Sequence, residues 1–246
     1  MTEFLPDNIP PHYIETAEKI RGYLVSVRGG APFLSGIDGQ ILVEWLDSSI
    51  SPSIICSVID KVALRRRKKR VKTRLTLKVC RGELNKIYKK NNKKSESQMQ
   101  KKAFQKINDK QDLPHIDKLK ERILAETLPI ALHHQRVELL NVIEELREVH
   151  KSQKDVYSLP QRQKAFEPIV QKAIVVLVAM HQQIFEHTID EHEQLHREAE
   201  FELTSLRTIL PPVQWRDSVE EVVRDKLRQR YPSLRVGVIW DAINQN

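Results

Sequence analysis

The residues best suited to a chemical task in this sequence are the cations between Lys61 and Lys102. This segment holds 18 of the chain's 41 Lys and Arg but only 2 of its 33 Asp and Glu, so its charge is +16 and that of the remaining residues is −8. Cations gathered in this way bind polyanions, because each neutralised phosphate releases counterions. The segment therefore predicts contacts with nucleic-acid phosphates, and the alternative is a solvated charge run or tail.

The predicted nucleic-acid-binding residues are the cations of two amphipathic stretches and one tyrosine among lysines. Backbone contacts by such residues give weak sequence specificity and a steep salt dependence, and the tyrosine could stack on a base or pack in the core. The residues are Arg65, Arg66, Arg67, Lys68, Lys69, Arg70, Lys72, Arg74, Lys78, Arg81, Lys86, Tyr88, Lys89 and Lys90.

The six consecutive cations from Arg65 to Arg70 cover every face of nearly two helical turns, and no acid adjoins them in sequence. Only acids from the negatively charged remainder of the chain could neutralise them. One arrangement of this kind is autoinhibition, in which an acidic long helix folds onto the basic residues and competes with phosphates.

A second group has residue types that bind metals: His187, His192, Glu193 and His196. Glu193 and His196 form an E-x-x-H, which ferritin-like bundles use in two copies with two further glutamates. The sequence has no second copy, and the H-E-x-x-H of zinc proteases is absent. A solvated polar helix face is the simpler interpretation, so we expect no metal and no cofactor.

Motifs of catalysis are missing from the sequence. It has no Gly-rich phosphate loop, no G-x-S-x-G and no Cys–His nucleophile arrangement. We therefore expect a protein without enzymatic activity and name no catalytic residue.

The elements that must position the cations are helices with apolar residues every three or four positions. In the first half they span about 12–28, about 36–47 with Ser35 as N-cap, and a third helix that opens at Ser51-Pro52. The third helix becomes cationic at Arg65, and a further helix follows near 77–88. The Lys-rich stretch 91–113 has no apolar periodicity and is predicted to be a linker.

The second half predicts longer helices. One runs from Pro114 to a break at Pro129 and resumes to about 151. A single helix of about 161–210 follows, with an apolar seam close to a heptad repeat. Ser218 and Glu221 form a capping box for the next helix, and 234–242 is predicted to be an extended piece leading into a short helix.

These elements predict an all-α protein with a small basic N-terminal unit (12–90), the 91–113 linker and a C-terminal unit (114–246). The C-terminal unit is expected to be a long antiparallel helical hairpin or coiled coil with short helices after it. Size and composition agree with helical cores.

Compartment and membrane signals point to the cytoplasm. The longest apolar run has eight residues, 173–180, against roughly 20 needed to span a bilayer, and residues 1–11 lack a signal-peptide pattern. Cys56 and Cys80 belong to no C-x-x-C pair, so both are expected to be reduced core thiols. We expect a cytoplasmic protein without a membrane partner.

Residues 33–88 resemble the C-terminal domain of DnaD-type bacterial replication proteins. The resemblance rests on Phe33-Leu34-Ser35, Trp45-Leu46, Ser51 with Ile54-Ile55, Ile59 with Ala63, and Cys80, Leu84 and Tyr88 at four-residue spacing. Cys80 stands where the family has Tyr, and Tyr88 where it has Trp. The resemblance implies DNA binding and a role in replication or primosome assembly. The segment is also similar to bacterial proteins of this size whose family supplies no activity.

The sequence therefore predicts a non-enzymatic nucleic-acid-binding protein, and we favour DNA over RNA as its partner. The alternative is a helical adaptor or self-assembling interaction module that binds no nucleic acid. In that case the partner is a second copy of the chain in a homodimer, or a helical protein, and the basic segment docks on an acidic protein surface.

Overall fold

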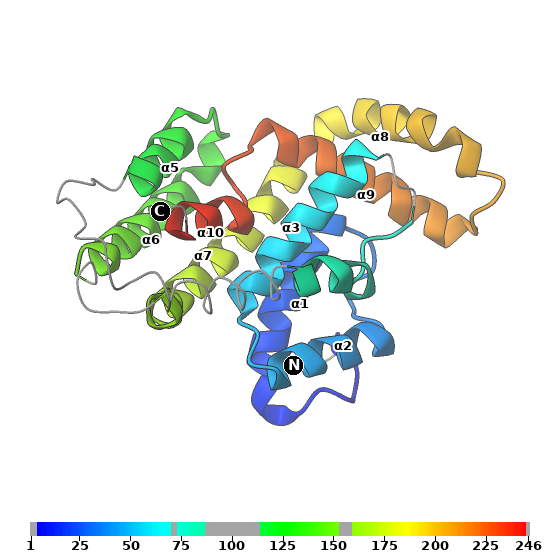
Figure 1. Cartoon of the computed structure of the whole chain (residues 1–246). Helices are drawn as coiled ribbons and strands as arrows, with labels where there is room; N and C mark the ends of the chain where they lie inside the picture. Colours follow the sequence, from blue (N-terminus) through cyan, green and yellow to red (C-terminus); the bar gives the residue numbers. More distant parts are fainter. Residues whose placement is uncertain (1–3, 70–72, 87–113, 153–158, 245–246) are drawn as a thin grey trace.

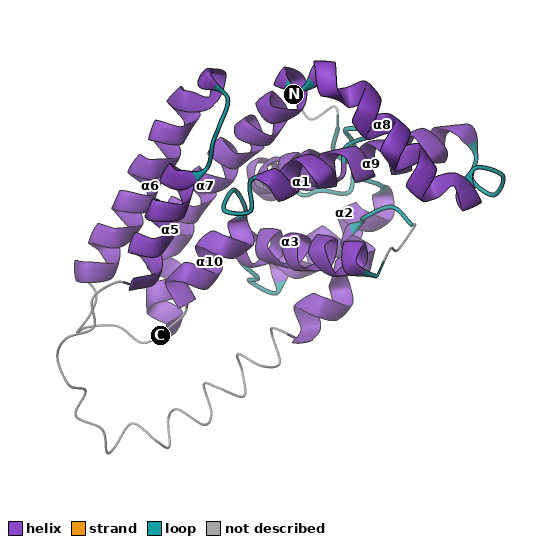
Figure 2. Cartoon of the chain, turned by 90° about the horizontal axis from the view of Figure 1, so that it is seen from above, coloured by secondary structure: helices purple, strands orange, loops and turns teal. Residues whose placement is uncertain are grey.

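The computed structural model describes residues 4–69, 73–86, 114–152 and 159–244, and every regular element in these ranges is a helix (Figure 1, Figure 2). The all-α prediction is confirmed. A further helix spans 77–86. The remaining elements are η1 (Pro11–Tyr13), α1 (Ile14–Arg28), α2 (Gly36–Asp47), α3 (Pro52–Lys68), α5 (Pro114–Ala125), η2 (Ile130–Leu132), α6 (His133–Ser152), α7 (Leu159–His187), α8 (Ile189–Leu203), η3 (Thr204–Leu206), α9 (Pro212–Arg230) and α10 (Val236–Asn244).

Local sequence signals mark the beginnings of α2 and α3 and the end of α1. Ser35 accepts a hydrogen bond from the Asp38 N–H at 3.1 Å, and Ser51 accepts one from the Ile54 N–H at 3.4 Å. Both bonds satisfy an N–H that the helix itself leaves unpaired. Gly29, with a positive φ of 67°, ends α1.

The core lies around α7, which contacts α1, α3, α6, α9 and α10 (Figure 1). The predicted heptad seam of α7 lies in this core, since Phe166, Val170, Leu177 and Ile184 are buried. Helices of the predicted 12–90 and 114–246 units thus contribute to one hydrophobic cluster. The predicted 91–113 linker lies outside the described residues.

The prediction of one helix over 161–210 is wrong. α7 ends at His187, and α8 begins at Ile189. Between them the Thr188 hydroxyl donates to the Ile184 carbonyl at 2.7 Å, a side-chain bond that bends helices. After this break α8 packs beside α9 instead of continuing the line of α7 (Figure 2).

Two further boundaries differ from the predictions. α9 begins at Pro212, where proline fits the first helical position, and Ser218 donates to the Gln214 carbonyl inside the helix instead of capping it. The region 234–242 is mostly the helix α10. Its alternating apolar residues are buried on several faces between α3, α5 and α7, as is typical of an enclosed helix.

Part of α7, Lys164–His187, is long and apolar enough to cross a membrane when judged by length and composition alone. Half of its apolar window is buried inside the protein. Core helices carry this composition because neighbouring helices cover most of their faces.

A buried polar network joins the first and last parts of the chain. The carboxylate of Asp60, on α3, accepts from the Tyr23 hydroxyl (2.7 Å), from an Arg228 Nη2 (2.5 Å) and from the Gly237 N–H (2.8 Å). Asp60 is 2% exposed, and Arg228 is 6% exposed. Four helices, α1, α3, α9 and α10, are therefore fixed to one carboxylate.

His181, on α7, lies beside this network and is also buried. Its Nε2 lies 2.8 Å from the Leu234 carbonyl, which can only accept, so Nε2 carries a proton. Its Nδ1 lies 3.2 Å from the Ser26 hydroxyl. Burial, together with the nearby positive charge of Arg228, lowers the pKa of His181 to about 3.

Candidate nucleic-acid interface

The predicted site residues that the structure describes lie on two neighbouring elements, the last turns of α3 and the helix 77–86. Arg65 and Glu83 connect these elements through an ion pair of 2.5 Å. Arg74 lies in the segment between them. Arg70, Lys72, Tyr88, Lys89 and Lys90 lie outside the described residues.

Three of the predicted lysines are exposed: Lys68 and Lys69 at the end of α3, and Lys78 on the helix 77–86. Their ammonium groups form no ion pair within the described ranges. Arg81 and Lys86 have side chains that are 56% and 73% exposed, although Arg81 pairs with Glu44 at 3.0 Å and Lys86 lies 3.7 Å from Glu83. Exposed pairs of this kind contribute little stability, so these cations can exchange partners readily. We call these five residues the exposed basic surface.

Arg67 and Arg74 are paired with acids of α9. Arg67 forms an ion pair with Asp225 at 3.1 Å and also donates to the Asp225 backbone carbonyl. Arg74 pairs with Asp217 at 2.9 Å. Two of the acids that pair with the described part of the basic segment therefore lie on α9, and the others are Glu44, Glu83 and Asp241. No ion pair in the described ranges joins the segment to the long helix of about 161–210 that the autoinhibition hypothesis invoked.

Glu221 lies on the same face of α9, because it is four residues from both Asp217 and Asp225. It accepts a hydrogen bond from the Leu75 N–H at 3.1 Å. Burial raises the pKa of Glu221, an effect that this N–H and the charges of Arg66 and Arg28 oppose.

Sequence reasoning missed the role of Asp217, Glu221 and Asp225. Their spacing is visible in the sequence, but it does not reveal which cations they meet.

Arg66 is placed differently from its neighbours. It is 7% exposed, and its guanidinium donates to the Thr73 hydroxyl at 3.3 and 3.4 Å. A side chain this enclosed is oriented toward the interior of the protein, whereas Lys68 and Lys69 face solvent.

The His and Glu group considered as a metal site is dispersed. In the part of the chain that the structure describes, no three His, Cys, Asp or Glu side chains come together in a metal-binding arrangement. The ring of His192 packs against Phe185, with centroids 4.4 Å apart, and lies 6.2 Å from the His196 ring.

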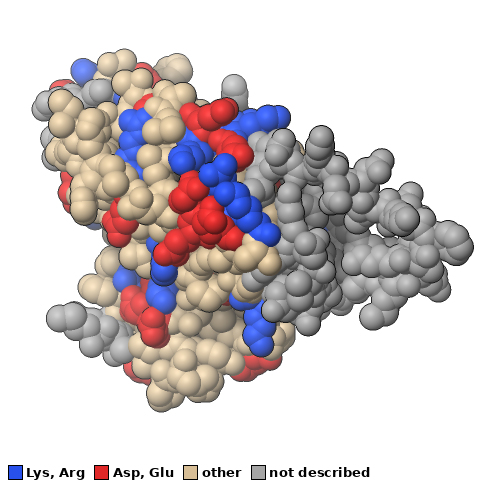
Figure 3. All heavy atoms as spheres, turned by 90° about the vertical axis from the view of Figure 1, so that its left-hand side faces the viewer, with Lys and Arg blue, Asp and Glu red and all other residues tan. Residues whose placement is uncertain are grey.

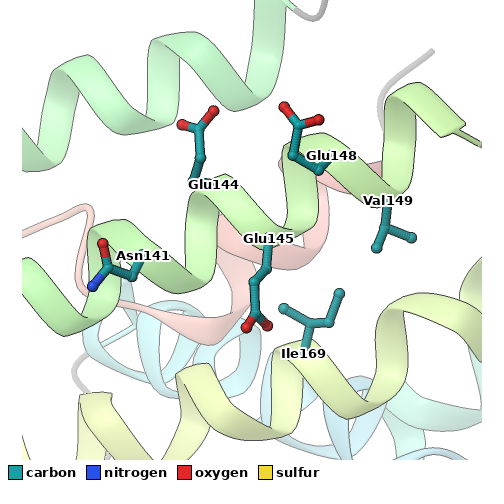
Figure 4. A pocket seen from close by; sticks show the side chains of 6 residues that line it. All are labelled: Asn141, Glu144, Glu145, Glu148, Val149 and Ile169. Atoms are coloured by element: carbon teal, nitrogen blue, oxygen red, sulfur yellow. The ribbon is translucent and has the colours of Figure 1, made fainter.

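A different face carries a group of acids on α6. Glu144, Glu145 and Glu148 line a shallow pocket together with Ile169 of α7 (Figure 4). Lys120 of α5, Lys151 of α6 and Lys172 of α7 pair with these acids. Figure 3 shows Lys and Arg side chains lying beside Asp and Glu on one face of the molecule. Hydrogen bonds from Lys120 and Arg147 lower the pKa of Glu144 to about 2. The acids are thus neutralised locally and form no separate anionic surface.

Comparison with known proteins adds no assignment. No protein-family model, no curated protein and no solved structure matches the chain.

Proposed function

We propose that the protein binds nucleic acid, with DNA favoured over RNA, through the exposed basic surface. The observation that carries this proposal is the exposure of Lys68, Lys69 and Lys78, which no carboxylate of the described ranges neutralises. Lysines that face solvent in this way bind phosphates as point charges. The resemblance of residues 33–88 to DnaD-type domains favours DNA and a role in replication.

The test is a fluorescence anisotropy titration with single-stranded DNA, double-stranded DNA and RNA of equal length over a salt series. Changing Lys68, Lys69 and Lys78 to Gln is expected to weaken binding to all sequences. The slope of log affinity against log salt is negative, and its magnitude should decrease by about one for each phosphate that the variant no longer neutralises.

The matched control changes Lys118, Lys164 and Arg216 to Gln, which removes the same charge from exposed positions elsewhere. Its affinity should stay close to that of the unchanged protein. The proposal fails if the intact protein does not bind any probe at low salt, or if the control weakens binding as much as the surface variant.

Neutralising the α9 acids should have the opposite effect. Changing Asp217 and Asp225 to Asn removes the ion-pair partners of Arg74 and Arg67. Both arginines can then contact phosphate, so we expect tighter binding and a salt slope steeper by about one for each arginine engaged.

The control for this pair is Glu148→Gln combined with Glu186→Gln, which removes the same two negative charges from exposed positions on α6 and α7. Equal tightening by both double variants would indicate a general charge effect and contradict the competition between α9 and phosphate.

The adaptor function has one observation in its favour. Phe201, Ile209 and Val213, at the connected ends of α8 and α9, are 83%, 71% and 59% exposed. Exposed apolar side chains in one region mark interaction surfaces, and α6 and α7 would supply the antiparallel helical pair of such a module. Sedimentation over a range of concentrations tests self-association, which the nucleic-acid function does not require.

A further inference from the structure

A cleft of about 720 Å³ lies where the end of α3 meets α8 and α9. Its volume is typical of a site for a small organic molecule. Its wall includes Arg66, Arg67, Leu203, Glu221, Val222 and Asp225.

Most charges on the cleft wall are already neutralised. Arg67 pairs with Asp225, and Lys226 pairs with Glu202 at 2.6 Å. Glu221 accepts the Leu75 N–H. Arg67, Asp225, Lys226 and Glu202 therefore offer little net charge to a ligand, whereas Glu221 lies within the electrostatic influence of Arg66.

Arg66 is the exception. It is 7% exposed, yet it forms no ion pair with a carboxylate in the described ranges. Within those ranges its guanidinium donates to the Thr73 hydroxyl, and its Nε has no acceptor. A buried guanidinium without an ion pair costs free energy. An anion that accepts its free N–H groups would remove part of this cost. Guanidinium groups bind carboxylate and phosphate in two-point contacts.

The rest of the wall is apolar. Val27, Leu75 and Leu203 are 2%, 1% and 6% exposed and form packed surface. Val222 is half-buried on α9, and Phe201 stands exposed at the rim of the cleft. A ligand seated here would therefore meet a guanidinium that forms no ion pair or hydrogen bond with a carboxylate of the described ranges, and an apolar wall.

We propose that this cleft binds a small molecule that carries one anionic group on an apolar body. The anionic group contacts Arg66, and the apolar body packs against Leu203, Val222 and Phe201. The cleft residues named here are not among the five residues of the exposed basic surface.

Two dyes that differ chiefly in one sulfonate test the proposal: anilinonaphthalene sulfonate and phenylnaphthylamine. Their affinities are measured by fluorescence titration of the full chain. Arg66→Met should weaken binding of the sulfonate dye about tenfold or more, as expected when a charge-assisted hydrogen bond is removed, and leave binding of the uncharged dye unchanged. Val222→Trp should fill the cleft and abolish binding of both dyes.

Val213→Trp adds the same side chain to an exposed position of α9 outside the cleft and should leave both affinities unchanged. Thermal melts establish that each variant is folded. Arg66→Met and Val222→Trp change different residues, so either variant alone tests the proposal if the other does not fold. Decanoate and decyl phosphate are added as competitors, and displacement by either supports the proposal and identifies the preferred anionic group. Displacement by neither, or unchanged sulfonate-dye affinity in the cleft variants, would overturn it.

Discussion

Changing Asp60 to Ala is expected to lower the free energy of unfolding by roughly 3–5 kcal/mol, the effect typical of breaking a buried ion pair. The Asp60 carboxylate is 2% exposed and accepts three hydrogen bonds, from Tyr23, Arg228 and Gly237. Without it the Arg228 guanidinium, itself 6% exposed, has no ion-pair partner among the residues that the structure describes. Removing one partner of a buried pair is costly because the other charge stays desolvated.

Urea unfolding followed by circular dichroism measures this destabilisation. The matched control is Asp241→Ala, because Asp241 of α10 pairs with Lys61, the neighbour of Asp60, and has a side chain that is 46% exposed. A half-exposed pair contributes less than about 1 kcal/mol. If both variants are destabilised by the same small amount, Asp60 does not hold the four helices together.

A double variant separates the charge from the packing. Asp60→Leu combined with Arg228→Met replaces both ions by apolar side chains, which often restores stability where a single replacement does not. We expect the double variant to be more stable than Asp60→Ala. An additive or larger destabilisation would indicate that the hydrogen bonds to Tyr23 and Gly237 matter more than the charge.

Acid should destabilise the protein through His181. Its pKa is about 3 in the folded chain, against an ordinary value of 6.5, because burial disfavours the charged ring. The unfolded chain therefore binds a proton between these two values that the folded chain does not bind. Stability from this group is fully present above about pH 6.5 and decreases as the pH falls toward 3, by about 3 kcal/mol between pH 7 and pH 4.

The measurement is the free energy of unfolding at a series of pH values for the protein and for His181→Gln. A glutamine amide can still donate to the Leu234 carbonyl but does not titrate. The difference between the two curves isolates His181 from the carboxylates that titrate in the same range. Parallel curves would mean that the folded chain tolerates a charged His181.

Several helix boundaries could be predicted because their causes are local. Ser35 and Ser51 cap helices through bonds to N–H groups three residues away, and Pro129 separates α5 from α6. The break at Thr188 is different. A threonine hydroxyl can bond within an unbroken helix as well, so only the packing of α8 on α9 reveals that the chain turns there.

The environment of the basic segment could not be predicted in the same way. The run of cations identified a surface, but Leu75 and Glu221 are 146 residues apart in the chain. Which acids meet Arg67 and Arg74 depends on the position of α9, and that position follows from core packing. The burial of Arg66 agrees with helical spacing, since it lies four residues after Val62 and seven after Ile59, both of which are buried.

The bond between Asp60 and Gly237 has a consequence for protein synthesis. The two residues are 177 positions apart, so a ribosome adding about 5–20 residues per second needs roughly 9 to 35 s to reach Gly237 after Asp60. During that interval the face of α3 that α10 covers has no intramolecular partner, and nascent chains with uncovered apolar helices are substrates for chaperones. A chain whose translation stops before Gly237 would therefore lack both this bond and the cover that α10 gives to α3.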